Sequence, residues 1–148
     1  VPSQTRPNAP IQRLLDLERS ADEIRAFSHA FNEQSLSVIE DRVTAGEQTF
    51  RVVLSQSAVD ALADGADLRQ RLASLLDADD AAVRVREDGI PLAVTIADDV
   101  VHLLLRDENG VLQASVDTDD AAVRSWAHDT FDHYWRAATP LSVEEFAE

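Results

Sequence analysis

Lysine and cysteine are both absent from the 148 residues of this sequence. Without cysteine, the chain cannot form a disulfide, a thiolate metal site or a cysteine nucleophile. Without lysine, it has no phosphate-binding P-loop, no kinase-type active site and no Schiff-base chemistry. A phospholipase D-type active site pairs histidine with lysine, so the sequence excludes that site even on a similar fold.

Glycine is scarce, with four residues, and neither the dinucleotide-binding GxGxxG pattern nor the nucleophile-elbow GxSxG pattern occurs. Long apolar runs are missing too. The longest, from Val100 to Leu105, is interrupted by His102 and is much shorter than the ~18 residues of a membrane span. No signal peptide is visible. These absences predict a cytoplasmic protein that does not contact membranes and is not an enzyme.

Basic charge is limited to 13 arginines against 28 acidic residues, which gives a net charge of −15. Self-repulsion of this size costs stability in dilute buffer. Molar salt removes the cost, because the Debye length falls to about 3 Å at 1 M. The composition therefore favours a halophile's protein over an ordinary acidic one. It also predicts that this segment does not bind nucleic acid, which normally requires a basic face.

The first half of the chain is typical of an α/β domain. Three of the five prolines lie in residues 1–10, so we interpret residues 1–19 as a linker and lead-in helix. Ser20 and Glu23 fit a capping box for a helix that should run to about Ala45, where Gly46 would stop it. A strand from Thr49 to Leu54, a helix from Ala58 and a strand from Ala82 to Arg86 then predict a parallel βαβ unit.

Three strands joined by tight turns should follow and form an antiparallel meander. They are Leu92–Ala97, Val100–Arg106 and Val111–Asp117. Asp117 or Thr118 would cap a last helix that ends near Ala138. Its apolar spacing predicts an inner face made of Val123, Trp126, Ala127, Thr130, Phe131 and Tyr134.

The predicted fold is therefore α/β, with a mixed sheet of about five strands formed by the βαβ unit and the meander. The N-terminal and C-terminal helices should cover this sheet. We place one effector or sensor domain at residues 20–140, followed by a C-terminal tail at 141–148.

Two groups of side chains are candidates for a ligand site. Ser55 and Ser57 follow a strand end, where open α/β sheets bind ligands, although they could instead cap the next helix. The aromatic residues of the last helix could belong to the core, line a pocket or form a partner surface. The candidate ligand-binding residues are Ser55, Arg86, Trp126, Tyr134 and Trp135.

Histidine and acidic residues offer metal-binding and catalytic interpretations. His128 with Asp132, and Asp129 with His133, stand four residues apart, a spacing that two ligands of one metal can use on a helix. A third ligand would have to come from elsewhere, such as His102 or His29. Acidic residues near strand ends could hold Mg²⁺ or transfer protons; these are Asp98, Asp99, Asp117, Asp119 and Asp120. A solvated helix face, turns and caps explain both groups more simply, so we expect no metal, cofactor or catalytic residue.

Five segments together resemble one known family. They are Leu92 to Asp99, Arg106 to Gly110, Val116 to Asp120, Val123 to Ala127 and Tyr134 to Leu141. Over roughly residues 20–142 the chain resembles the C-terminal effector domain that follows a winged helix-turn-helix in archaeal transcription regulators. That domain is known from the methanogenesis-regulator family and is abundant in haloarchaea.

This resemblance implies a regulatory domain without catalysis that forms homodimers and senses a small molecule. It would contact DNA only through an N-terminal winged helix, which is missing from this chain. No ligand residue of the family can be carried over. The alternatives are a free-standing protein-interaction module of a halophile and a small hydrolase or metal enzyme. We expect dimer contacts at Ile11, Leu14, Leu15 and Leu17, or along the aromatic stripe of the last helix.

Overall fold

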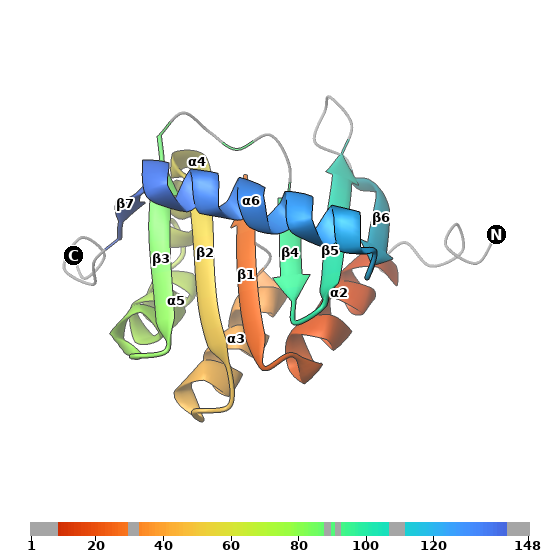
Figure 1. Ribbon diagram of the computed structural model, residues 1–148. Coiled ribbons are helices and arrows are strands. Elements are labelled where there is room, and N and C mark those ends of the chain that lie inside the picture. Colours follow the sequence, from red (N-terminus) through yellow and green to blue (C-terminus); the bar gives the residue numbers. More distant parts are fainter. Residues whose placement is uncertain (1–8, 30–32, 88–89, 91–92, 107–111, 142–148) are drawn as a thin grey trace.

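The computed structural model describes residues 9–29, 33–87, 90, 93–106 and 112–141. In this part of the chain, one mixed sheet has the strand order β6-β5-β4-β1-β2-β3-β7, and helices lie on both of its faces (Figure 1). The α/β class is confirmed. The sheet has seven strands, so it is larger than the predicted sheet of about five.

The helices that cover the two faces of the sheet come from different parts of the chain. Helices α2 to α5 lie on one face, and α6 crosses the other (Figure 1). The bounds are α2 (Ala9–Ser20), β1 (Glu23–Ser28), α3 (Glu33–Thr44), β2 (Thr49–Ser55), α4 (Gln56–Ala63), α5 (Ala66–Asp77), β3 (Ala81–Arg86), β4 (Ala93–Ala97), β5 (Val100–Arg106), β6 (Leu112–Thr118), α6 (Ala121–Ala137) and β7 (Thr139–Pro140).

Strands β1, β2 and β3 are parallel and form the centre of the sheet. The predicted βαβ unit from β2 to β3 is therefore confirmed. So is the antiparallel meander β4-β5-β6, which joins the centre through an antiparallel pairing of β4 with β1. At the other edge, β7 pairs with β3, and Leu141 N–H donates to Val83 O at 2.9 Å. Strands β1 and β7 were not predicted.

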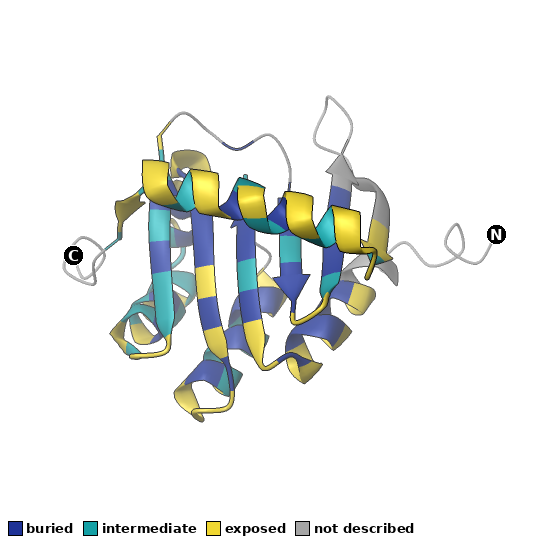
Figure 2. Ribbon diagram, viewed as in Figure 1, coloured by how far each residue is buried: buried dark blue, intermediate teal, exposed yellow. Residues whose placement is uncertain are grey.

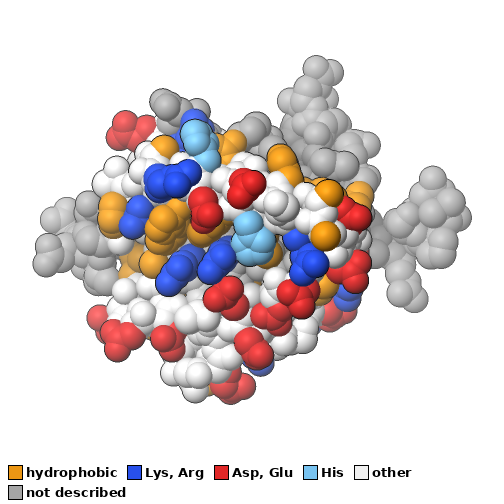
Figure 3. All heavy atoms as spheres, viewed as in Figure 1, with side chains coloured by type: hydrophobic (Ala, Val, Ile, Leu, Met, Phe, Trp, Pro, Cys, Tyr) orange, Lys and Arg blue, Asp and Glu red, His pale blue; other side chains and the backbone are white. Residues whose placement is uncertain are grey.

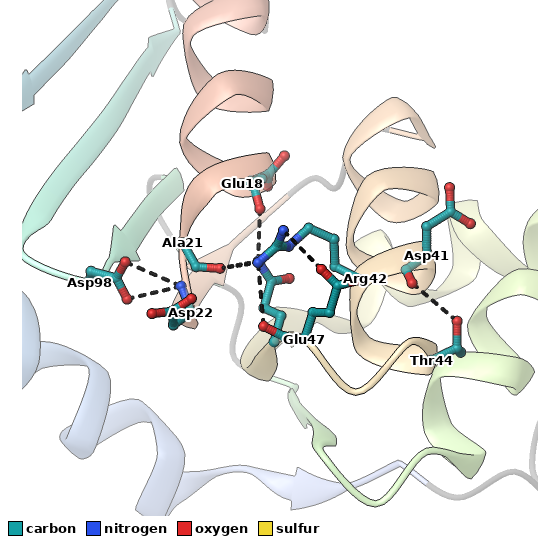
Figure 4. Close-up of polar contacts among 9 residues, drawn as sticks. Glu18, Ala21, Asp22, Asp41, Arg42, Thr44, Glu47 and Asp98 are labelled. Carbon is teal, nitrogen blue, oxygen red and sulfur yellow. Dashed lines mark hydrogen bonds and ion pairs between the residues drawn. The ribbon is translucent and has the colours of Figure 1, made fainter.

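The long helix predicted from Ser20 to Ala45 is wrong. Ser20 ends α2, because its hydroxyl donates to Asp16 O at 3.0 Å instead of capping a new helix. The chain then enters β1, where the Asp98 carboxylate accepts the backbone N–H of Asp22 (Figure 4) and also that of Glu23. Gln48 Nε2 donates to Glu18 O at 2.7 Å and to Ala21 O at 2.9 Å, which fixes the same junction.

Two hydrophobic cores lie against the central strands. Successive residues of β2 belong to different cores: Val52 packs towards α3 and α5, whereas Val53 packs beneath α6. Phe27 and Ile24 divide in the same way on β1. Strands buried on both faces are expected where helices cover a parallel sheet, and Figure 2 shows this layer of buried residues.

Helix α2 belongs to the domain core. Leu14, Leu15 and Leu17 are between 2% and 7% exposed, and Leu14 packs with Ala93 and Leu104. The expectation that these leucines need a second copy of the chain is therefore wrong, because their own sheet and α3 bury them. The side chain of Ile11 lies outside the described residues.

Helix α6 begins later than predicted. Asp120 is its N-cap and accepts from Ala122 N–H at 3.0 Å and from Val123 N–H at 3.2 Å, so neither Asp117 nor Thr118 is the cap. Ala127 and Phe131 are buried as predicted, but Trp126 is 44% exposed. No helix in the described part of the chain has the length and apolar character needed to cross a membrane.

Two buried titratable side chains lie on the α2 side of the sheet. Burial raises the pKa of Glu18 to about 7, opposed in part by Ser35 and Arg19. Burial lowers the pKa of His102, opposed by the nearby Asp117 carboxylate. His102 is 1% exposed, and neither of its ring nitrogens has a hydrogen-bond partner among the described residues. Both residues therefore favour the uncharged form in the folded protein.

Candidate ligand-binding site

The carboxyl ends of β1, β2 and β3 meet at one edge of the sheet, where open α/β sheets bind ligands. Ser55 and Arg86 are the last residues of β2 and β3 and are direct neighbours in the register. Helix α6 contacts strands β1 to β5 and passes over this region (Figure 1). Parallel pairing therefore brings together two of the five candidate residues.

Tyr134 joins these two residues from α6. The Arg86 guanidinium lies 4.8 Å from the centroid of the Tyr134 ring, a cation–π distance. The Tyr134 ring also has an apolar neighbour, since the Phe27 and Tyr134 ring centroids are 5.1 Å apart. Ser55, Arg86 and Tyr134 thus provide a hydroxyl, a cation and an aromatic ring at the strand ends.

The Ser55 hydroxyl already has three hydrogen-bonding neighbours. Its hydroxyl accepts from Ala58 N–H at 3.2 Å, which caps α4, and it lies 3.0 Å from the Ser57 hydroxyl. It also donates to His29 O at 3.4 Å. Because Ser55 is 2% exposed, the capping role that the sequence offered as an alternative accounts for its position.

The two tryptophans lie apart from this group. Trp135 stacks on Phe131 at 5.4 Å, and the Arg84 guanidinium lies 4.2 Å from its ring. Arg84 Nη1 also donates to Trp135 O at 2.8 Å and holds the end of α6 against β3. Trp126 is nine residues earlier on the helix, about 13 Å along its axis. The structure therefore does not bring Trp126 to the candidate site.

Sequence reasoning found Arg86 but missed three other arginines on the α6 face of the sheet. Arg25 shares this face with Phe27, and Arg51 shares it with Val53, because strand residues alternate between faces. The same alternation and the register place Arg84 and Arg86 on it. Figure 3 shows basic side chains gathered on this face, with acidic ones along its lower edge. The strand period contained this signal, but β1 had been assigned to a helix.

A separate cleft of about 370 Å³ lies on the opposite face, between α4, β3 and β7. This cleft is not the pocket that the aromatic residues of the last helix could line, because α6 lies on the other face of the sheet. The cleft is lined by Gln56, Val59, Asp60, Ala63, Arg69, Val85, Glu87, Thr139, Pro140 and Leu141.

The histidine and aspartate pairs of α6 do not assemble a metal site in the described residues, where no group of three or more His, Cys, Asp or Glu side chains could hold a metal ion. His128 Nδ1 instead lies 3.3 Å from Arg25 Nη1. Asp98 and Asp120 are used in the β1 junction and the α6 cap, and Asp117 pairs with Arg13 at 2.9 Å. The acidic cluster near the strand ends therefore has local structural partners.

A family match shows the class of protein to which this α/β domain belongs. The chain belongs to the family described as the middle domain of the methanogenesis regulatory protein FilR1, whose model matches residues 7–137. The resemblance to the methanogenesis-regulator family is confirmed, although the family is described as a middle domain and not as a C-terminal one. No curated protein matches the chain.

Several solved structures share the fold. TrmBL2, described as an archaeal chromatin protein with a novel mode of DNA binding, has a TM-score of 0.68 and 18% identity over 90% of this chain and 50% of that chain. This chain thus spans half the length of TrmBL2. NucT from Helicobacter pylori has a TM-score of 0.67 and 14% identity over 89% and 91% of the two chains. Nuc from Salmonella typhimurium, a phospholipase D family member, has a TM-score of 0.67 and 11% identity over 89% and 90%.

The likeness to Nuc contradicts the prediction that this chain is not an enzyme. That prediction rested on missing motifs and took no account of the fold, which the chain shares with a phospholipase D family member. At 11–14% identity the likeness shows the fold alone. The family match points mainly to regulation of transcription.

Proposed function

We propose that this chain is the ligand-sensing and dimerisation domain of a haloarchaeal transcription regulator. The observation that carries the proposal is the match to a regulator's middle domain over residues 7–137. DNA would be contacted by a winged helix outside this chain, and the net charge of −15 supports that division of labour. The cytosol of a salt-accumulating cell is the compartment that such a charge suits.

The effector would bind at the carboxyl ends of β2 and β3. Arg86 and Tyr134 supply a cation and an aromatic ring there, and Phe27 and Ile90 belong to the apolar core beneath α6. This combination suits a small molecule with one apolar part and one polar or anionic part. The fluorescence of Trp135 on α6 would change when the effector binds. Ser55 would contribute mainly by capping α4 and so fixing the start of that helix beside the site.

The dimer contact would use the α6 face. Trp126 and Val116 are 44% and 45% exposed, and both belong to this side of the sheet. A large exposed aromatic side chain is a common anchor of protein interfaces. Two-fold pairing through α6 would also place two DNA-binding domains for a palindromic site. Effector binding acts on DNA only if it favours one dimer geometry over another.

Replacing Arg86 with glutamine tests the effector site. We expect that one or more members of a panel of small metabolites will change the tryptophan fluorescence of the wild-type chain in molar KCl. Arg86→Gln should then weaken binding by about tenfold, since a charge-assisted contact is lost. Arg136→Gln is the matched control, because Arg136 is exposed on α6 and the charge change is the same. Fluorescence that stays flat across the panel would leave the proposal without its sensing function.

A free-standing protein-interaction module is the second candidate. The exposed Trp126 favours it as much as it favours a homodimer. The two functions differ in whether a DNA-binding domain is encoded upstream of Val1, which the genomic reading frame reveals directly.

A further inference from the structure

Two arginines lie side by side on the α6 face, in a chain dominated by acidic residues. Arg25 of β1 and Arg51 of β2 are register partners on adjacent parallel strands. Neighbouring strands are about 4.8 Å apart, and like charges directly opposite one another destabilise a sheet. A negative charge between the two side chains would relieve this repulsion.

The protein supplies little of that charge from its own residues. Glu23 Oε1 lies 3.6 Å from Arg25 Nη2, and the Glu23 side chain is 54% exposed. Arg51 is exposed and has no ion pair or hydrogen bond with any residue that the structure describes. Arginines elsewhere in the described chain do pair with acids, such as Arg71 with Glu40 at 2.8 Å. Like Arg84 and Arg136, Arg51 has no acidic partner among the described residues, although the chain has about two acids for each arginine.

Helix α6 completes the surroundings of this pair. His128 Nδ1 is 3.3 Å from Arg25 Nη1. A guanidinium has only N–H donors, so His128 Nδ1 accepts in this contact and the ring proton is on Nε2. Arg84 stands diagonally from Arg51 on the next strand and adds positive charge, although Trp135 holds its guanidinium. The patch therefore presents two guanidinium forks and one imidazole N–H donor.

We propose that Arg25, Arg51 and His128 form a binding site for a small oxyanion, a phosphate or carboxylate group of a metabolite. Guanidinium groups bind these planar or tetrahedral oxyanions with two parallel N–H···O bonds, which favours them over chloride. Phe27 and Val53 form the next row of this face and separate the patch from Ser55 and Arg86 at the strand ends. The oxyanion site is thus distinct from the proposed effector site and does not depend on it.

A small anion fits this patch better than a nucleic acid does. The acidic residues along the lower edge of this face would repel a chain of phosphates (Figure 3), whereas one oxyanion has to contact only the two guanidinium groups and the imidazole. Duplex DNA would also need many such contacts to bind in molar salt. Nucleic acid is therefore an outcome for the test to exclude.

The test is a titration of the whole chain with potassium phosphate and, separately, potassium malonate, replacing KCl at constant ionic strength. Amide and side-chain ¹H–¹⁵N spectra should show saturable shifts concentrated at Arg25, Arg51 and His128. Arg51→Gln should weaken binding by about tenfold, and Arg51→Lys, which keeps the charge but loses the fork, should weaken it by less. Arg136→Gln removes the same charge from an exposed position on α6 and should leave the affinity within about twofold of wild type.

The phosphate and malonate arms distinguish phosphoryl from carboxylate ligands, and saturation by either supports the site. Shifts that rise linearly without saturation would overturn it. So would equal losses of affinity in Arg51→Gln and Arg136→Gln, because the attraction would then be general and not local. Shifts at these residues with a short DNA duplex, but with neither small anion, would replace the proposal with a nucleic-acid contact.

Discussion

Raising the KCl concentration from about 0.1 to 3 M should raise the melting temperature by roughly 10 °C or more, because the Debye length falls to about 3 Å near 1 M. The cause is the net charge of −15 on a chain of 148 residues. Exposed ion pairs do not offset this repulsion. Pairs such as Arg19 with Asp16 and Arg124 with Asp99 are long, at 3.4 Å, and exposed pairs contribute little. Circular dichroism at a series of KCl concentrations measures the effect.

A variant with fewer acidic residues gives the matched comparison. Asp79 and Asp80 are exposed in the acidic turn before β3, close to Asp77. Replacing Asp79 and Asp80 with asparagine should raise stability at low salt and reduce the dependence on KCl. If the wild-type melting temperature is the same across the range, the chain is not adapted to salt and the halophile assignment fails.

Glu18→Gln should raise the free energy of unfolding by about 2–3 kcal/mol at about pH 8 and change it little near pH 4.5. The Glu18 carboxyl group is 3% exposed, and its Oε1 has no hydrogen-bond partner in the described residues. Its pKa rises from 4.5 to about 7 in the folded state. The folded state therefore keeps a proton that the unfolded chain releases above pH 4.5, so stability falls as the pH rises towards and past about 7.

Urea unfolding of both proteins in molar KCl, at these two pH values, measures the difference. His102 acts in the opposite direction, because its lowered pKa costs stability as the pH falls below its usual value of 6.5. It is present in both proteins, so its contribution cancels in the comparison. Glu47→Gln is the control, since the Glu47 side chain is 60% exposed. A gain from Glu18→Gln that is equal at both pH values would show that charge burial is not its cause.

Local sequence signals predicted the second half of the fold well. Tight turns fixed the meander, since Asp98 adopts a positive φ of 51° between β4 and β5 as a turn residue can. The first half failed at one place. Ser20 and Glu23 have the spacing of a capping box, but the backbone N–H groups of Asp22 and Glu23 bond to Asp98, 76 and 75 residues away. No local pattern contains that contact.

The same error limited what could be predicted of the site. Ser55 and Arg86 were found because each ends a strand that the sequence reveals, and parallel pairing makes them neighbours. Arg25 could not be placed beside Arg51 while β1 was assigned to a helix. Trp126 was assigned to the inner face from its spacing alone, but its position on the flank of α6 leaves it 44% exposed. The spacing of apolar residues shows where the buried stripe of a helix runs, but it does not show how many residues at the stripe's edge are covered.

Sedimentation velocity in molar KCl, at tens of micromolar protein, tests the central proposal of a dimerising regulatory domain most directly. The account predicts a species of about twice the 16.3 kDa chain mass for the wild type and for the control Asp129→Asn on the same helix. It predicts a monomer for Trp126→Ala, which removes the exposed anchor of the α6 face. A wild-type chain that sediments as a 16.3 kDa monomer under these conditions would contradict it.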